Sequence, residues 1–241
     1  MDRKIYMRDI YPYYWIKARK KYYHNIPYDK NLITLIEESC QPKIILDVAI
    51  GTGDPYADYF VNKNIDVYGI DISQILIESC NKYNKLIKTS VGDAENMDYS
   101  TNFFDLVYCF HSTWYFTNVQ NAVSEMIRVT KNQGYVFFDI QNLKNKYHKD
   151  AILKKEKRKN SKLYFIIHKV KFIIKALWGI KESWSYTIYD TPTDPDLLVD
   201  LLKNFQYWIF GRDKDDMLIQ INDENDISKF QRLVYKVLKT K

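Results

Sequence analysis

The sequence predicts an α/β protein built on a doubly wound, Rossmann-like parallel sheet. Five short apolar runs, rich in β-branched and aromatic residues, alternate with stretches that have the spacing of amphipathic helices. Several of these runs end in Gly or Asp, which suit the ligand-binding edge of such a sheet. The chain has 241 residues, of which 46% are hydrophobic and 27% charged, and this composition fits one large folded domain.

The expected parallel strands are apolar on both faces, as strands covered by helices on both sides usually are. They span residues 43–48, 66–70, 87–91, 104–109 and 134–139. A final pair of strands is expected at residues 207–210 and 232–237, joined by the acidic stretch 213–226.

The expected helices include most of the first forty residues, with one helix starting at Asp29 or Asn31 and stopping before Pro42. Residues 119–129 form the clearest amphipathic helix, with apolar side chains on one face. The last expected helix runs to residue 202 and has two candidate N-cap residues, Thr193 and Asp194.

A basic segment separates the fifth strand from the last helix. Residues 144–175 hold twelve Lys or Arg and two acidic residues, although the whole chain has a net charge of only +6. Apolar residues recur at helical spacing over 163–177, and residues 184–189 alternate like a strand. We interpret residues 143–190 as an insertion that covers the substrate, and a membrane-surface helix is the alternative.

Three cysteines, Cys40, Cys80 and Cys109, are too few and too far apart for a disulfide framework. No His/Cys cluster predicts a metal site, and no apolar run is long enough to span a membrane. The first residues lack the apolar core of a signal peptide, so we expect a cytoplasmic protein.

A small-residue loop follows the first expected strand. It runs from Asp47 through Ala49 and Gly51 to Gly53, so a ligand can approach the backbone closely. A dinucleotide fingerprint would need a third glycine at position 56, where the sequence has Tyr56. The carboxylate of Asp54 stands where a phosphate would bind, so a phosphate-free ligand is favoured.

Two more loops fit an adenosine ligand. Asp71 ends the second strand, where a carboxylate accepts hydrogen bonds from ribose hydroxyls; capping of the next helix is the alternative. Asp93 follows the third strand and suits the exocyclic amine of a purine, while the backbone of Ala94 meets the ring edge. The three loops together predict a site for adenosine linked to a positively charged tail.

On these motifs the sequence resembles the class I S-adenosylmethionine-dependent methyltransferases. The resemblance covers roughly residues 43–142 and the terminal strand pair, with Asn132-Gln133-Gly134 at the family's usual Pro-Gly-Gly position. It implies a seven-stranded sheet whose last strand is antiparallel. Ala49, the pair Ser112-Thr113 and the spacing from Asp139 to Asn142 resemble the glycine N-methyltransferase-like subtype.

The resemblance implies S-adenosylmethionine as cofactor and S-adenosylhomocysteine as product. Residues implied for its methionine, ribose and adenine parts are, in that order, Asp47, Ala49, Gly51 and Gly53; Asp71 and Ile72; and Asp93 and Ala94. Phe110 and His111 would flank the sulfonium.

The acceptor pocket is expected between the core and an N-terminal helical lid. Tyr14 and Tyr22 are candidate acceptor contacts in the lid, although packing between helices is an equally good interpretation. His111 is a candidate base for a hydroxyl acceptor, with Tyr14 as a second candidate catalytic residue. Ser112 and Asn142 are further candidate substrate contacts.

We therefore expect one methyltransferase domain over residues 1–241. It divides into a lid (1–40), a cofactor-binding core (43–142), the cover (143–190) and a final helix with the strand pair (191–241). The preferred acceptor is a small, anionic metabolite or sugar, methylated on O or N. An RNA methyltransferase that uses the basic segment ranks second, and a non-catalytic cofactor-binding or membrane-surface module ranks third.

Overall fold

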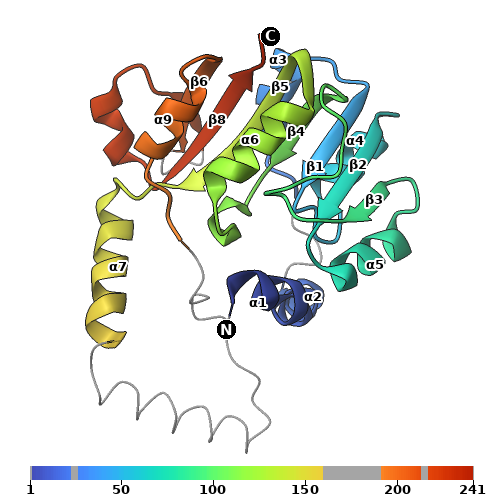
Figure 1. Cartoon of the computed structure of the whole chain (residues 1–241), viewed down its shortest axis with the longest axis horizontal. Coiled ribbons are helices and arrows are strands. Elements are labelled where there is room, and N and C mark those ends of the chain that lie inside the picture. The colour runs from blue at the N-terminus through green and yellow to red at the C-terminus, as the bar shows by residue number, and fades with distance from the viewer. Residues whose placement is uncertain (1, 23–26, 160–190, 213–216, 241) are drawn as a thin grey trace, which may run out of the picture.

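The computed structural model describes residues 2–22, 27–159, 191–212 and 217–240 (Figure 1). Its centre is an eight-stranded sheet with the order β3-β2-β1-β4-β5-β8-β6-β7. The strands are β1 (Ile44–Val48), β2 (Asp66–Asp71), β3 (Lys88–Val91), β4 (Phe104–Cys109), β5 (Thr130–Gln141), β6 (Gln206–Arg212), β7 (Leu218–Gln220) and β8 (Arg232–Leu238).

Strands β1 to β5 are parallel, and β8 pairs antiparallel with both β5 and β6. The strand order reverses between β1 and β4, which are hydrogen-bonded neighbours. In open α/β sheets, ligands bind at this switch point, outside the carboxyl ends of the strands. The fold therefore places any ligand site beside the loops after β1 and β4.

Helices cover both faces of the sheet. The described helices are α1 (Arg3–Asp9), α2 (Tyr11–Tyr22), α3 (Lys30–Ser39), α4 (Tyr56–Val61), α5 (Gln74–Tyr83), α6 (Val119–Val129), α7 (Lys146–Lys159) and α9 (Asp196–Leu202), with the short 3₁₀ helices η1 (Thr113–Tyr115) and η2 (Glu224–Lys229). One apolar core lies between the sheet and α6 and α9, and the other packs α3, α4 and α5 on the opposite face.

Successive side chains of a central strand point to opposite faces of the sheet and so contribute to both cores. In β4, Val107 and Cys109 belong to the core on the α6 side, while Leu106 and Tyr108 belong to the core on the α3 side. All four side chains are fully buried. Burial of apolar side chains on both faces is the physical reason that β4 reads as a continuous apolar run.

Side-chain caps fix where several helices begin. Asp29 accepts hydrogen bonds from the backbone of Asn31 and Leu32 at the start of α3, which decides between the two expected caps. Asn118 caps α6, which has the bounds that the sequence predicts. The N-cap position of α9 is Pro195, and the Asp194 carboxylate still accepts from the backbone N–H of Asp196.

The sheet departs from the sequence expectation in two places. It has an eighth strand, β7, because the acidic connector pairs three of its residues with β6. The fifth strand starts at Thr130 and not at Gly134, since Thr130 already pairs with Phe104 across an irregularity in the register.

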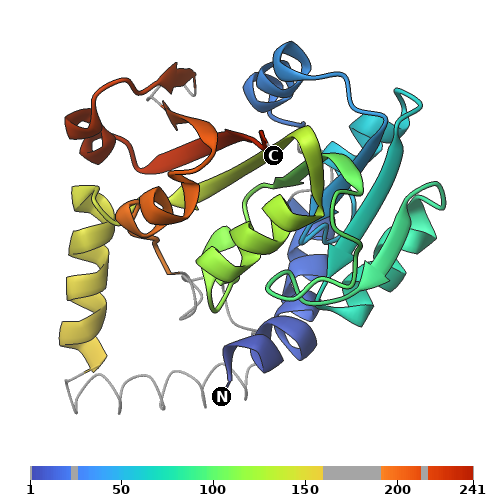
Figure 2. The ribbon, with the colours of Figure 1, turned by 45° about the horizontal axis from the view of Figure 1, so that its top comes forward.

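The expected cover lies largely outside the described residues, which include only its helix α7. The candidate amphipathic helix at 163–177 and the candidate strand at 184–189 fall within residues 160–190 and are not described. Figure 2 shows α7 well apart from the α1–α2 pair. Within the described residues, no helix has the length and apolarity needed to cross a membrane.

Candidate functional site

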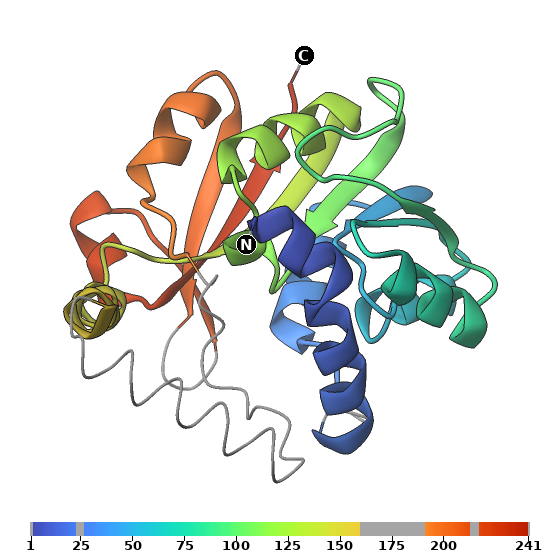
Figure 3. The same ribbon diagram turned by 60° about the horizontal axis from the view of Figure 1, so that its bottom comes forward.

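A cavity of about 670 Å³ opens at the carboxyl ends of the central strands. Its lining combines the loops after β1, β2 and β4 with residues of α1 and α2, which lie across this end of the sheet (Figure 3). The volume is in the range of small-molecule sites. The N-terminal helices therefore cover the site from the side that the sheet leaves open.

The loop after β1 has an unusual backbone. Ala49 and Gly51 have φ angles of 60°, and Gly53 has a φ of 87°. A side chain at Gly53 would also collide with Cys80, since its Cβ would lie 2.7 Å from the sulfur. This left-handed conformation favours glycine, so Ala49 adopts it at a steric cost.

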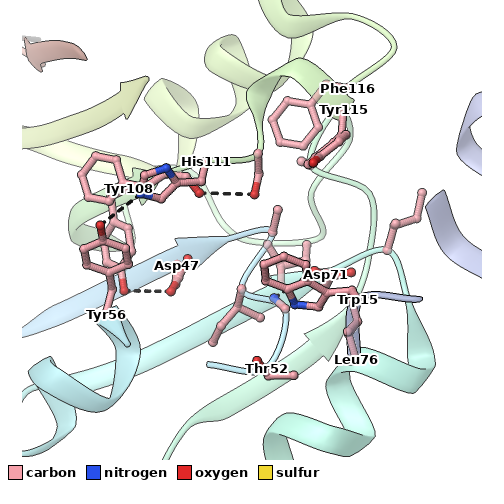
Figure 4. Close-up of a pocket in the computed structure, with 18 of the residues that line it drawn as sticks. Trp15, Asp47, Thr52, Tyr56, Asp71, Leu76, Tyr108, His111, Tyr115 and Phe116 are labelled. Carbon is pink, nitrogen blue, oxygen red and sulfur yellow. Dashed lines mark hydrogen bonds between the residues drawn. The ribbon is translucent and has the colours of Figure 1, made fainter. Parts of the chain in front are cut away.

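Asp47 is a buried carboxylate at the end of β1. Its side chain accepts a hydrogen bond of 2.9 Å from the hydroxyl of Tyr108, and only 7% of the residue is exposed (Figure 4). Burial, opposed by this hydrogen bond and reinforced by the nearby Asp71, raises the pKa of Asp47 to about 8. A cationic group bound in the cavity would compensate the charge of this carboxylate.

Asp71, at the end of β2, holds the neighbouring loops together. Its carboxylate accepts hydrogen bonds from the backbone N–H of Gly51 (3.0 Å) and of Ser73 (2.9 Å). Burial raises its pKa to about 6, against the lowering effect of these backbone donors. Ser73, and not Asp71, caps α5 through its own hydroxyl. Asp71 also lines the cavity, so a ribose role and a loop-organising role are compatible.

Asp93 faces the cavity from the loop after β3, next to Ala94. Lys4 of α1 forms an ion pair with Asp93 (2.6 Å) and with Glu95 (2.9 Å). Glu95 in turn accepts from the backbone N–H of Thr117. These contacts fasten the first helix to the same loop that the sequence assigns to adenine.

The opposite wall of the cavity carries a polar cluster. The hydroxyl of Tyr56 lies 3.1 Å from Nε2 of His111 (Figure 4), and Arg232 donates to Nδ1 of the same ring. Behind them, the fully buried Asp139 forms an ion pair with Arg232 and accepts from the backbone N–H of His111 (2.8 Å).

The surroundings of His111 disfavour its protonated form. Loss of hydration and the neighbouring Arg232 cation lower the pKa of His111 to about 4, although Asp139 acts in the opposite direction. Burial raises the pKa of Tyr56 above its usual value. Both groups are therefore neutral at physiological pH, when Arg232 is charged.

Most of the expected site residues line this one cavity: Asp47, Ala49, Gly51, Asp71, Ile72, Asp93, Ala94, Phe110, His111 and Ser112. Gly53 lies behind the loop against Cys80 and is not in the lining. Tyr14 is half-buried on α2 and outside the lining, and the side chain of Tyr22 lies outside the described part.

Asn142 has a structural position and is not in the lining, contrary to the expected substrate contact. Its buried amide donates to the backbone carbonyls of Ile227 and Phe230 and accepts from the backbone N–H of Lys144. Both N–H donors of the side chain are used by the backbone, so its amide has no donor left for a ligand.

Several lining residues were not expected from the sequence: Tyr11, Trp15, Tyr28, Tyr56, Tyr115, Arg212 and Arg232. The spacing of Tyr11 and Trp15 places both on one face of α2, which is the signal that could have found them in place of Tyr14. The two arginines come from the C-terminal strands, where no motif marks them. Within the described residues, no group of three or more His, Cys, Asp or Glu could hold a metal ion.

Comparison with known proteins gives a family match for the core. Residues 46–138 match the family model of a methyltransferase domain. The demethylmenaquinone methyltransferase of Renibacterium salmoninarum is 33% identical over 93 residues, which cover 37% of this chain and 38% of that protein. The enzyme of the same name from Thermotoga maritima is 31% identical over 107 residues, which cover 44% of this chain and 46% of that protein. The match thus spans less than half the length of each curated relative.

Solved structures share the fold over nearly the whole chain. A SAM-dependent methyltransferase from Thermotoga maritima superposes with a TM-score of 0.60 at 15% identity, covering 94% of this chain and 97% of that chain. A TehB-like SAM-dependent methyltransferase from Corynebacterium glutamicum gives 0.56 at 15% identity, covering 95% and 96%.

The sheet order and the cavity at its switch point are those of a Rossmann-like ligand-binding domain. Residues 46–138 match a methyltransferase domain, and the chain has the fold of S-adenosylmethionine-dependent methyltransferases. S-adenosylmethionine is the cofactor that this family and fold imply, and a set of carboxylates facing one cavity fits a cationic, hydroxyl-bearing ligand. The glycine N-methyltransferase-like subtype stays a prediction.

Proposed function

We propose that the protein transfers the methyl group of S-adenosylmethionine to a small-molecule acceptor. The observation that carries this proposal is the convergence of Asp47, Asp71 and Asp93, from three adjacent strand ends, on one cavity. In this assignment Asp47 faces the cationic amino-acid part, Asp71 holds the ribose hydroxyls, and Asp93 accepts from the adenine amine. Each carboxylate meets a donor or cation of the cofactor.

Methyl transfer requires little covalent chemistry from the protein. The nucleophile of the acceptor forms a bond to the methyl carbon, the carbon–sulfur bond breaks, and its electron pair stays on a neutral thioether. Holding the two reactants in line, about 3 to 3.5 Å apart, can lower the barrier by several kcal/mol. The rigid strand ends and the overlying helices α1 and α2 suit this positioning role.

Two features support a small molecule as the acceptor. The cavity is roofed by α1 and α2 and has aromatic walls, including Trp15, Phe110 and Tyr115, which suit a compact, partly apolar ligand. Both curated relatives are named for methylation of demethylmenaquinone, a small molecule. Arg232 in the lining favours the anionic acceptor that the basic segment suggested, whereas Arg212 is held in an ion pair with Asp29.

Cofactor binding is tested by calorimetric titration of S-adenosylhomocysteine into the wild type and Asp71→Asn. Asparagine keeps one oxygen acceptor for the loop backbone but removes the charge, and hydrogen bonds to a charged group are each worth about 1.5 to 3 kcal/mol. We expect the affinity to fall at least tenfold. Asp98→Asn, at an exposed position outside the cavity, is the matched control. Equal affinities for the wild type and Asp71→Asn would refute the ribose role.

The acceptor class is tested with S-adenosylmethionine that carries a radioactive methyl group. The protein is incubated separately with an acid-soluble metabolite fraction and with bulk RNA. Label in the metabolite fraction supports the proposal, whereas label confined to RNA would replace it with the RNA alternative. Tight cofactor binding with no transfer to either fraction would favour a non-catalytic module.

A further inference from the structure

We call the wall of the cavity that carries the polar cluster the acceptor wall. The cluster combines side chains from three distant parts of the chain. Tyr56 begins α4, His111 follows β4, and Arg232 begins β8, yet all three side chains line the same cavity. Asp139 anchors the group from below and is fully buried. The family motifs assign none of these side chains except His111, whose expected place is beside the sulfonium.

The contacts of His111 fix which ring nitrogen carries the proton. A guanidinium has only N–H groups, so Arg232 can only donate to Nδ1, and Nδ1 must use its lone pair as acceptor. The neutral ring therefore has its proton on Nε2, which donates to the oxygen of Tyr56. Nη2 of Arg232 also lies 3.4 Å from Nε2, and Nδ1 lies 3.8 Å from a carboxylate oxygen of Asp139, so the assignment rests on the closer contact of Arg232 with Nδ1. The Arg212–Asp29 ion pair is the other charged group near the ring.

This tautomer leaves His111 without a lone pair to accept a proton from an acceptor hydroxyl. Nδ1 is engaged by Arg232, and Nε2 already carries a proton, so neither nitrogen is a base. The ring instead orients Tyr56. The phenol oxygen of Tyr56 accepts from His111 and from the backbone of Asp29, so its own proton is directed away from both of these donors.

Arg232 provides positive charge at the same place. Its hydrogen bonds to Asp139 and His111 use Nε and Nη2, and within the described part of the chain Nη1 has no partner. Aromatic rings stand next to this corner: the ring of Phe110 lies 5.3 Å from that of Tyr56, centroid to centroid. A flat aromatic ligand carrying an anionic oxygen matches both the rings and the two donors.

We propose that Tyr56 and Arg232 form an acceptor subsite for the anionic oxygen of a phenolate-type aromatic molecule, with His111 as a positioning residue. This inference rests on the proposed function. The oxygen anion forms the bond to the methyl carbon, the sulfonium–carbon bond breaks, and the electron pair neutralises the sulfur. The acceptor arrives without its proton, so the reaction needs no base from the protein.

The tautomer is tested first, by two-dimensional ¹⁵N NMR of the histidine rings at pH 6 to 8. The chain has four histidines, and the spectrum of His111→Asn identifies the signals of His111. Asparagine tolerates the left-handed backbone at this position, where φ is 61°. We expect a neutral ring with the proton on Nε2 throughout. A proton on Nδ1, which leaves a free lone pair on Nε2, would overturn the inference.

The subsite is tested with 4-nitrophenol, whose phenolate absorbs visible light and whose neutral form does not. In the complex with S-adenosylhomocysteine, we expect the wild type to bind the phenolate and to lower the apparent pKa of the probe. Tyr56→Phe should bind the phenolate at least tenfold more weakly, since a hydrogen bond to a charged group is lost. The neutral analogue 4-nitroanisole should bind the wild type and Tyr56→Phe equally.

The outcomes separate this inference from the proposed function. If S-adenosylhomocysteine does not bind the wild type, the proposed function fails. A second outcome is that S-adenosylhomocysteine binds equally to the wild type and Tyr56→Phe, but the wild type binds the phenolate no better than 4-nitroanisole. In that case only the acceptor subsite fails. A spectral shift that is the same in Tyr56→Phe would also refute the role of Tyr56.

Discussion

Replacement of Asp47 by asparagine should stabilise the ligand-free protein, and more so at higher pH. The folded state raises the pKa of Asp47 from 3.8 to about 8, so below pH 8 it binds a proton that the unfolded chain releases. The stability from this proton is complete below about pH 4 and is lost as the pH rises through 8. Between pH 4 and pH 8 the free energy of unfolding therefore falls by about 1.4 kcal/mol per pH unit, and above pH 8 the loss levels off at about 6 kcal/mol.

The asparagine introduced by Asp47→Asn would have the shape of the protonated carboxyl, and its amide oxygen can still accept from the hydroxyl of Tyr108. Asp47→Asn should therefore match the wild type near pH 4 and gain about 1.4 kcal/mol on it for each pH unit from 5 to 8. Urea unfolding without cofactor, at one-unit steps from pH 5 to pH 9, measures this difference.

The control is Asp66→Asn, since Asp66 is exposed, forms an ion pair with the exposed Lys88 and lies outside the cavity. Its stability difference from the wild type should be small, because an exposed ion pair contributes little. Curves for Asp47→Asn and the wild type that stay parallel from pH 5 to 9 would refute a carboxyl protonated by burial. Asp47→Asn should also bind S-adenosylhomocysteine more weakly, because the asparagine side chain cannot ionise beside the amino group of the ligand as the Asp47 carboxyl can.

Three further substitutions probe the framework of the site. Ala49→Gly should raise the melting temperature by about 2 to 4 °C, because relief of a left-handed backbone is worth about 1 kcal/mol at this chain size. Gly53→Ala should lower it, because the new Cβ would meet the sulfur of Cys80 at 2.7 Å. Lys239→Met should lower it by about 6 °C or more, because the three N–H groups of the buried ammonium are shared among four nearby oxygens, three of them backbone carbonyls at the end of α6.

Scanning calorimetry or circular dichroism measures all three melting temperatures, and Asp98→Asn serves as the surface control. A loss of stability in Ala49→Gly would mean that the alanine methyl contributes packing that outweighs the backbone strain. An unchanged melting temperature in Gly53→Ala would mean that Cys80 moves aside freely. An unchanged melting temperature in Lys239→Met would contradict a structural role for its four contacts.

The cofactor half of the site could be predicted from the sequence because it follows the order of the chain. The expected ligand residues lie in the last residues of a strand or in the loop that follows it, and parallel neighbours bring the loops after β1 and β2 to the same edge. Asp71 even connects two of these loops through its hydrogen bond to Gly51. The local sequence patterns and the rule that ligands bind at the carboxyl ends of the strands are together sufficient to predict the cofactor half of the site.

The acceptor half could not be predicted in this way, because pairing of distant strands creates it. Arg232 lies opposite Gln141 only because β8 inserts antiparallel between β5 and β6, which carries its guanidinium to Asp139. Nothing local distinguishes Arg232 from other surface arginines in the sequence. Asn142 shows the limit of local patterns. A polar residue just after a strand is typical of a ligand contact, but the amide of Asn142 donates its hydrogen bonds to backbone carbonyls.

Residues with positive φ lie where the cofactor half and the acceptor half of the site meet. Five described residues other than glycine have positive φ, and two of them, Asn64 and Asn102, are of the type that accepts this conformation readily. Histidine also accepts it more often than most residues, whereas alanine does not. Ala49 and His111 follow the adjacent strands β1 and β4 and line the same cavity. Strained residues persist where surrounding contacts over-determine them, and the hydrogen bond from the backbone of His111 to buried Asp139 is such a contact. The same turn places the ring of His111 between Arg232 and Tyr56. The positive φ of His111 therefore also positions the polar cluster of the acceptor wall beside the loop after β1.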